Sequence, residues 1–406
     1  MFNVKTIDET KTLLRKFTQD YGLKTFKIDI DAALGYVSAE TVYSQTDVPH
    51  FNRSTVDGYA VFHNVVAFAS ASSIVPLAMR GIVEMGKPCD LLLDNESCVY
   101  VPTGGHIPNN ATAVVMIENT EVLGEDVLIK KRASKWDNIL LKGSDINHGA
   151  VVMKPNQVIT DRLIGVLKAT GVQAVTVFKP LTALVISTGD EITDRLPLKT
   201  GRILDINTHT VKHYLHKHHV RVEKTVVIDD NFAVYKETVI EGFKQYDLVI
   251  ASGGSSVGTH DYTFDIMQSL NAEIFVHGIS IKPGKPTIFA MHNNKLFVGL
   301  PGQPTSAYIV LHTFFSTIYA GIFRLKDSLP EAYLIAKLTQ NVMGSLGRTT
   351  VQLVKICNDD EILVTPIHAK SGMIDALSTA DGYIIIDADC EGYSEGDSVH
   401  VYRWGD

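Results

Sequence analysis

Cysteine is scarce in this sequence. Cys89, Cys98, Cys357 and Cys390 are scattered over 406 residues, and no two of them form a C-x-x-C pair. This pattern excludes a disulfide-stapled scaffold and fits thiols that are buried as small apolar groups in a reducing compartment. We therefore expect a cytoplasmic protein.

The sequence also lacks a net positive charge, a signal peptide and long apolar runs. The net charge of −8 argues against a nucleic-acid-binding protein that depends on a broad positive surface. The start, MFNVKTIDETKTLLRKF, lacks the apolar core of a signal peptide, and we expect no run long enough to span a membrane. An anionic ligand would have to be held by local lysines, arginines, backbone N–H groups or a metal ion.

The composition is that of a globular protein, with 45% hydrophobic and 20% charged residues. The length predicts two to four domains. In the N-terminal part we expect helices at 6–21, 29–41 and 161–169, and short β segments over 70–127. After Arg324 the helical pattern ends, and a small all-β domain is predicted from β-like stretches at 333–342, 349–357, 361–366, 382–387 and 398–404.

Strand and helix patterns alternate in the part between. Candidate strands lie at 181–187, 220–228, 247–252, 273–277, 287–291 and 296–300, and candidate helices at 207–218, 231–245, 261–270 and 305–322. This alternation predicts a multidomain α/β protein with a doubly wound, mostly parallel sheet. The expected domains are an N-terminal α/β linker domain (1–45 and 140–178), a β-rich inserted domain (46–139), the α/β sheet domain (179–325) and a C-terminal β-barrel-like domain (326–406).

The stretch DLVIASGGSSVGTHDYT, residues 247–263, organises the chain. Its apolar start predicts a buried parallel strand, and its glycines and serines predict a loop at the carboxyl edge of the sheet. Backbone N–H groups and hydroxyls in such a loop can bind an anion. The alternative is a glycine-rich crossover loop that binds no ligand.

Three more loops favour ligand binding. Strand-like runs lead into STGDE at 187–191 and PGQP at 301–304, and the turn KPGKP at 282–286 carries two lysines. We expect these loops to form one composite pocket with the 253–258 loop at one edge of the sheet.

Acidic residues and histidines elsewhere admit two interpretations. Asp57 is either a turn residue or a metal or substrate contact, and Asp145 lies in a second compact loop. The helix predicted at 207–218 has Asn207 as a good N-cap, and it carries or adjoins His213, His216, His218 and His219. These histidines could bind a metal, but we favour a solvated helix end.

The ordered motifs resemble one known family. DVPHFNRSTVDGYAV, PTGGHIP, AVVMIE, KGSDI, STGDEI, GRILDIN, ASGGSSVGTHDYT, KPGKP and GLPGQP follow each other within residues 29–306, as in the MoeA and gephyrin E-domain family of molybdenumtransferases. The resemblance implies a MogA-like molybdopterin-binding sheet domain. It also implies insertion of molybdenum from molybdate into adenylylated molybdopterin, with Mg²⁺-dependent release of AMP.

The resemblance also implies roles for particular residues. Catalytic roles fall to Asp57, Asp145, Glu191, Asp229 and Asp261, of which Asp57, Asp145, Glu191 and Asp261 are candidate ligands of Mg²⁺ or molybdate. Substrate-binding roles fall to Thr103, Ser187, Thr188, Gly189, Gly253, Gly254, Ser255, Ser256, Gly258, Lys282, Lys285, Pro301, Arg348 and Ser371. One departure is Gln303, where the family mostly has Asn.

Partners and alternative functions follow from the same resemblance. It implies an elongated homodimer with sites built from both chains, and contact with a molybdopterin adenylyltransferase or with maturation factors of molybdoenzymes. We expect no nucleic-acid or membrane partner. The alternatives are a non-catalytic cofactor-binding scaffold and the adenylyltransferase itself.

Overall fold

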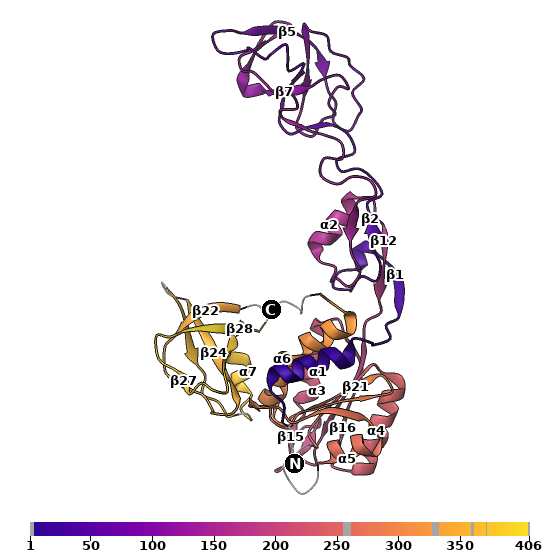
Figure 1. Ribbon diagram of the computed structural model, residues 1–406, viewed down its shortest axis with the longest axis vertical. Coiled ribbons are helices and arrows are strands. Elements are labelled where there is room, and N and C mark those ends of the chain that lie inside the picture. The colour runs from indigo at the N-terminus through magenta and orange to yellow at the C-terminus, as the bar shows by residue number, and fades with distance from the viewer. Residues whose placement is uncertain (1–3, 255–260, 327–332, 359–360, 371, 405–406) are drawn as a thin grey trace.

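The computed structural model describes residues 4–254, 261–326, 333–358, 361–370 and 372–404. They form an elongated molecule (Figure 1). A β-rich part lies at one end and continues into a small linking part. At the other end an α/β part and a C-terminal β part lie side by side (Figure 1).

The α/β part is built on a sheet with the strand order β16-β13-β17-β21-β20-β18. The first four strands pair in parallel, whereas β20 pairs antiparallel with both of its neighbours, β21 and β18. The strands are β13 (Thr182–Thr188), β16 (Arg221–Ile228), β17 (Leu248–Ser252), β18 (Glu273–His277), β20 (Ile288–His292) and β21 (Lys295–Leu300). The helices are α3 (Asn207–Lys217), α4 (Phe232–Gln245), α5 (Tyr262–Ser269) and α6 (Pro304–Phe323). The predicted doubly wound, mostly parallel sheet is confirmed.

Both faces of this sheet are covered. Leu248 and Ile250 of β17 belong to a core shared with α3, α6 and α1 (Ile7–Thr18), whereas Val249 and Ala251 belong to a core shared with α4 and α5. This alternation follows from the two-residue period of a strand. It explains why β17 is apolar at every position from Leu248 to Ala251, although a half-exposed strand would alternate.

Helix α6 corrects the expectation that no run has membrane-spanning length. Among the described residues it is the one helix long and apolar enough to cross a membrane, and 89% of its most apolar window is buried inside the protein. It is apolar on all sides because the sheet lies beneath it and α1 packs on it, with Thr18 against Gly321.

The linking part combines two small strand pairs with one helix. Its elements are β1 (Thr25–Asp29), β2 (Val42–Tyr43), β11 (Val151–Met153), α2 (Asp161–Ala169) and β12 (Ala174–Phe178). The helix predicted at 29–41 is wrong, because only a 3₁₀ turn, Ile30–Ala32, forms there. Gly35 has a φ of +78°, and Val37 and Ser38 make β-bridges to Val158 and Val177.

The outer part holds a six-stranded sheet with the order β7-β4-β6-β5-β9-β8. Its strands are β4 (Gly58–Val61), β5 (Val75–Ile82), β6 (Ser97–Val101), β7 (Ala113–Met116), β8 (Thr120–Leu123) and β9 (Asp126–Ile129). The two-stranded pair of β3 (Arg53–Ser54) and β10 (Ile139–Leu140) accompanies it, as does the 3₁₀ turn η2 (Ile117–Asn119).

The C-terminal part is a small barrel. Strands β24, β25, β22, β28 and β26 pair in that order, and β26 pairs back with β24. The elements are β22 (Tyr333–Leu338), β23 (Val342–Met343), β24 (Thr349–Asn358), β25 (Ile362–Pro366), β26 (Gly382–Ile386), β27 (Gly392–Tyr393) and β28 (Ser398–Arg403). A short helix, α7 (Asp375–Thr379), was not predicted. Strand β19 (Ile281–Lys282) of the α/β part extends the barrel by pairing with β24.

Candidate functional site

A cavity of about 1210 Å³ lies where β13, β17 and β21 end. The loops that follow parallel strands meet at this edge, which is where α/β sheets bind ligands. It brings together these predicted site residues: Ser187, Thr188, Gly189, Glu191, Gly253, Gly254, Lys282, Lys285, Pro301 and Arg348. Among the described residues, the four predicted loops thus line one space.

Two hydroxyl groups in the cavity wall have no hydrogen-bond partner among the residues that the structure describes. Ser187 and Thr188 end β13 and are 0% and 4% exposed, yet the Ser187 Oγ and Thr188 Oγ1 atoms make no hydrogen bond. A buried polar atom normally has a partner, because leaving it unpaired costs about 1–3 kcal/mol. Their place in the wall indicates that a bound ligand supplies the missing partner.

Gly253, the first residue after β17, lies very close to the backbone at the end of β13. Its φ is +95°, and a Cβ atom there would lie 2.3 Å from the carbonyl oxygen of Thr188. Only glycine fits this position. Glycine therefore lets the loop after β17 pack directly against the end of β13.

Asn207 ties two of the cavity loops together. Its Nδ2 donates to Ser252 Oγ (2.5 Å) and to the carbonyl oxygen of Gly302 (2.7 Å). The prediction that Asn207 is the N-cap of α3 is wrong: Ile206 holds the cap position, and the carboxylate of Asp205 accepts hydrogen bonds from Thr208. Asp205 and Asn207 both belong to the motif GRILDIN, but the spacing of this motif does not predict where their side chains point.

A basic wall joins the sheet part to the barrel. Lys282 in β19 and Arg348 before β24 both line the cavity, and Ile281 pairs with Thr349. Lys282 Nζ also donates to Ser345 Oγ at 2.8 Å. Two parts of the chain that are distant in sequence therefore place positive charge on the same cavity.

The cavity also has an acidic edge. Glu191 and Asp230 line the cavity, and the N–H of Asp230 donates to Asp190 Oδ1 at 3.0 Å. Partial desolvation and the charges of Asp190 and Glu191 raise the pKa of Asp230, although its side chain reaches solvent. The predicted Asp229 is not among the lining residues, and the acid directly after it takes that place.

The acids predicted from the N-terminal half lie elsewhere. Asp57 Oδ1 accepts hydrogen bonds from the N–H (2.7 Å) and Oγ1 (3.0 Å) of Thr103, so it ties the segment before β4 to the loop after β6. Asp145 lies in a neighbouring loop, where its N–H donates to Val48. The outer sheet and the α/β sheet are at opposite ends of the molecule (Figure 1). A single chain does not bring Asp57, Asp145 and Thr103 to this cavity.

Asp261 also stands apart from the cavity lining. It is the N-cap of α5, accepts a hydrogen bond from the N–H of Phe264 (3.1 Å) and lies 3.2 Å from His277 Nε2. Its neighbour Tyr262 lines the cavity instead. The predicted residues Ser255, Ser256, Gly258 and Ser371 lie outside the described residues.

The histidines at the end of α3 divide into two kinds. His213, His216 and His219 are exposed, as the solvated helix end predicts. His218 instead packs on the ring of Tyr214, with ring centres 4.7 Å apart. Burial lowers the pKa of His218 to about 4, and the charge of Lys217 adds to this effect.

Family models match the chain in three consecutive segments. Residues 5–171 match the MoeA N-terminal region (domain I and II), residues 184–320 a "probable molybdopterin binding domain", and residues 336–404 the MoeA C-terminal region (domain IV). Molybdopterin molybdenumtransferase of Haemophilus influenzae is 29% identical, with 98% of each chain covered. The protein of the same name from Staphylococcus epidermidis is 28% identical over 97% of this chain and 95% of its own.

A solved structure agrees over the full length. The molybdopterin biosynthesis MoeA protein from Pyrococcus horikoshii superposes with a TM-score of 0.80 and 30% sequence identity, and 100% of both chains is covered. The order of segments, the sheet topology and the C-terminal barrel therefore have one explanation: the chain belongs to the MoeA family.

Proposed function

We propose that this chain is a molybdenumtransferase of molybdenum cofactor biosynthesis. Its substrates are molybdate and adenylylated molybdopterin, and AMP is released in the presence of Mg²⁺. The full-length relatives with that name support the reaction class. The observation that carries the proposal is the pair of unpartnered hydroxyls of Ser187 and Thr188 in a cavity with a basic wall.

The cavity residues suit a substrate that contains a phosphoanhydride. The hydroxyls of Ser187 and Thr188 can donate to oxygen atoms of the substrate, and the glycine backbone at 253 and 254 allows close approach. Lys282, Lys285 and Arg348 can balance the negative charge of phosphate or molybdate. Fixed positive charge stabilises the oxyanion that develops as AMP leaves.

The acidic edge suits a divalent cation. Glu191 and Asp230 are hard oxygen donors. Desolvation, and then the charges of Asp190 and Glu191, raise the pKa of Asp230, and a bound cation would offset both effects. When bound, Mg²⁺ supplies charge neutralisation at the phosphate oxygens. Glu191 and Asp230 would hold it beside the basic wall.

We also propose that the complete site is shared between two chains of a homodimer. The place of Asp57 and Thr103 supports this, because they adjoin β4 and β6 of the outer sheet, which lies at the opposite end of the molecule from the α/β part (Figure 1). Asp145 lies in the connection to that outer part, where its N–H donates to Val48. A two-fold interface would set the outer part of one protomer over the cavity of its partner and form two equivalent sites.

One assay tests the reaction. Purified protein is incubated with adenylylated molybdopterin, molybdate and Mg²⁺, and AMP is quantified by chromatography. Molybdate-dependent AMP release supports the proposal. Pyrophosphate formed from ATP and molybdopterin would instead identify an adenylyltransferase, and neither product would identify a scaffold.

Complementation tests the shared site. Asp57→Ala and Glu191→Ala are each expected to be inactive. After refolding together, random pairing makes about half of the dimers mixed, each with one intact site, so activity should recover to about a quarter of wild type. Mass spectrometry confirms that mixed dimers form. Mixed dimers without activity would place both acids in the site of one chain.

A further inference from the structure

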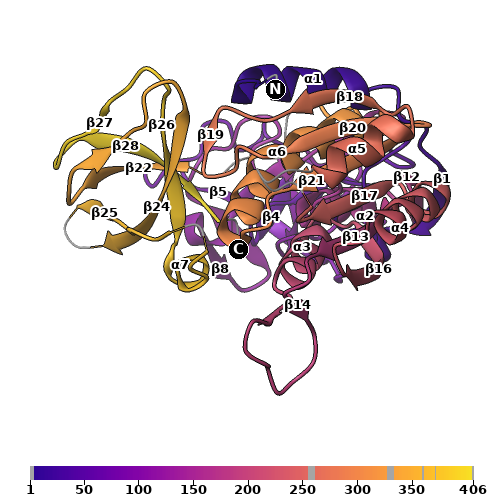
Figure 2. The same ribbon diagram turned by 90° about the horizontal axis from the view of Figure 1, so that it is seen from below.

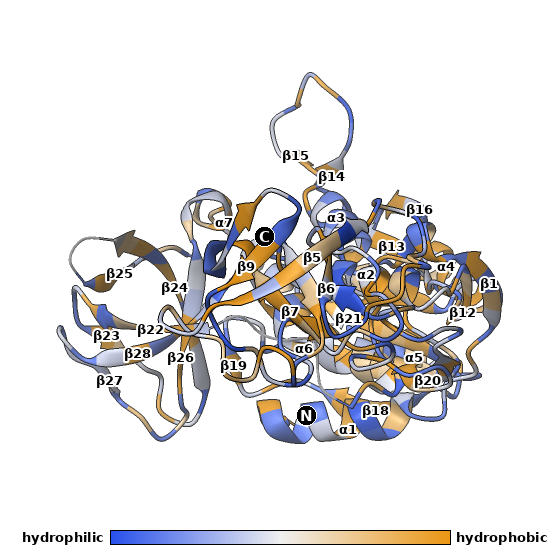
Figure 3. Cartoon of the chain, turned by 90° about the horizontal axis from the view of Figure 1, so that it is seen from above, coloured by the Kyte–Doolittle hydropathy of each residue, from blue (hydrophilic) through white to orange (hydrophobic). Residues whose placement is uncertain are grey.

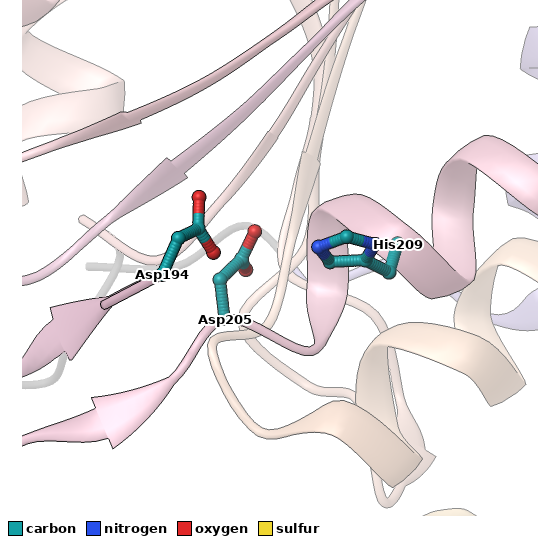
Figure 4. A group of neighbouring side chains, drawn as sticks. All are labelled: Asp194, Asp205 and His209. Carbon is teal, nitrogen blue, oxygen red and sulfur yellow. The ribbon is translucent and has the colours of Figure 1, made fainter. Parts of the chain in front are cut away.

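A second group of metal-ligating side chains lies at the mouth of the cavity. Asp194, Asp205 and His209 each offer one ligand atom, and these atoms all lie within 4.8 Å of one another. Figure 4 shows the two carboxylates side by side and the imidazole ring of His209 facing them. We propose that these three side chains bind a divalent transition-metal ion of the Zn²⁺ or Mn²⁺ class, which fastens the loop of residues 195–202.

The backbone sets the two carboxylates next to each other. Strands β14 (Ile192–Thr193) and β15 (Ile203–Leu204) pair in parallel, with Thr193 opposite Leu204. Asp194 directly follows β14, and Asp205 directly follows β15. The N–H of Asp205 donates to the carbonyl oxygen of Thr193 at 3.1 Å. His209 reaches the same point from the first turn of α3.

Asp205 is the second observation that indicates a cation. Its side chain is buried, with 7% exposure, and no described basic side chain forms an ion pair with it. Its hydrogen bonds come from the N–H and hydroxyl of Thr208, which leaves half of its roughly four lone-pair sites available. A buried carboxylate without a positive partner is costly, and a metal ion supplies that partner.

Arg202, at the C-terminal end of this loop, does not compensate this charge. Arg202 Nη1 donates to the carbonyl oxygens of Asp190 and Ile192. Two carboxylates with one divalent ion make a neutral site. An imidazole nitrogen beside two carboxylate oxygens favours Zn²⁺ or Mn²⁺ over Mg²⁺, which prefers an all-oxygen octahedron.

The geometry requires little adjustment. Metal–ligand bonds of about 2.0–2.2 Å set ligand atoms roughly 3–4 Å apart. Asp194 and His209 are exposed and can rotate to close the remaining distance, while Asp205 is fixed by Thr208. Three protein ligands leave at least one coordination position open.

The ion would fix a segment that has little other support. The loop between β14 and β15 extends away from the body of the protein (Figure 2), and it carries both hydrophobic and hydrophilic stretches (Figure 3). Leu196 of this loop is 73% exposed. Leu198, Ile203 and Leu204 nevertheless line the cavity. A metal joining both ends of this loop to α3 would therefore set the shape of one cavity wall.

Zn²⁺ titration of chelator-treated protein tests the proposal without any assay of activity. Calorimetry should give one tight site per chain, and His209→Ala and Asp194→Asn should each weaken it at least about tenfold. The matched control is His213→Ala combined with His216→Ala, two exposed histidines of the same helix, which should bind as wild type. Because all four substituted residues are exposed, each variant should fold, which circular dichroism checks. Unchanged affinity in His209→Ala, or an equal loss in the control, overturns the site.

Trypsin tests whether the ion fastens the loop. Cleavage after Arg195, Lys199 or Arg202 should slow severalfold when Zn²⁺ is added to wild type and should not change in His209→Ala. Cleavage that is insensitive to Zn²⁺ in a protein that binds it would refute the fastening role. The result is independent of the molybdenumtransferase proposal, because neither readout involves its substrates.

Discussion

The α/β sheet and the outer sheet place their polar loops differently. In the α/β part, β13, β17 and β21 run in the same direction, so their loops meet at one edge and enclose a cavity. In the outer part, β4 pairs antiparallel with both β6 and β7, so consecutive loops go to opposite ends. A parallel sheet can build a pocket within one chain, whereas the outer sheet offers isolated side chains such as Asp57.

The largest effect is expected where a parallel-sheet loop needs glycine. In Gly253→Ala the new Cβ atom would clash with the carbonyl oxygen of Thr188. We expect activity to fall about a thousandfold, as when a key oxyanion contact is lost, and stability to fall by about 2 kcal/mol. AMP release and urea unfolding measure these effects. In the control Gly302→Ala, the nearest atom is 3.6 Å from the new Cβ, so stability should be unchanged.

The next effect separates ligand binding from folding. Thr188→Val removes a hydroxyl that has no partner in the described part of the chain, so the free energy of unfolding should stay equal or rise. The rate of AMP release should fall about tenfold to hundredfold, the value of one hydrogen bond to a charged group. Thr350→Val removes another unpartnered hydroxyl outside the cavity lining and should leave the rate unchanged. Equal rates in both variants would argue against a ligand at Thr188.

A smaller effect concerns the acidic edge. A raised pKa means that ionised Asp230 destabilises the fold, at pH values above the folded pKa. Asp230→Asn should therefore increase the urea midpoint at pH 7 and weaken Mg²⁺ binding. The gain in midpoint should disappear as the pH falls through the raised pKa toward 3.8, because wild-type Asp230 then becomes neutral. A gain that persists at the lowest pH would assign it to another cause.

The smallest effect is expected at Gln303, the position where the family mostly has Asn. Gln303 lines the cavity and precedes Pro304, the first residue of α6. Gln303→Asn keeps the amide and shortens its reach by one methylene, so activity should stay within about tenfold of wild type. A loss beyond about a hundredfold, roughly 2.7 kcal/mol of transition-state stabilisation, would show that the longer side chain has a specific partner.

The doubly wound, mostly parallel character of the α/β sheet could be predicted, because strand-like apolar runs alternate with helical patterns along the chain. The strand order β16-β13-β17-β21-β20-β18 was not predicted. The pocket edge followed, since the ends of parallel strands converge. Side-chain direction could not be derived: Asp230 rather than Asp229 lines the cavity, and Asn207 bridges two loops rather than capping its helix. Residues 29–41 have a composition that suits a helix, but the helix predicted there does not form. Tertiary β-bridges from Val37 to Val158 and from Ser38 to Val177 override the local preference.

Helix α1 has a consequence for synthesis of the chain. Its apolar side packs on α6, where Thr18 meets Gly321, and the OH of Tyr21 donates to Asp247 at 2.8 Å. The ribosome makes α1 first and α6 about 300 residues later, which takes roughly 15–60 s at about 5–20 residues per second. During that time the apolar side of α1 has no partner, so nascent chains are open to chaperone binding until α6 emerges.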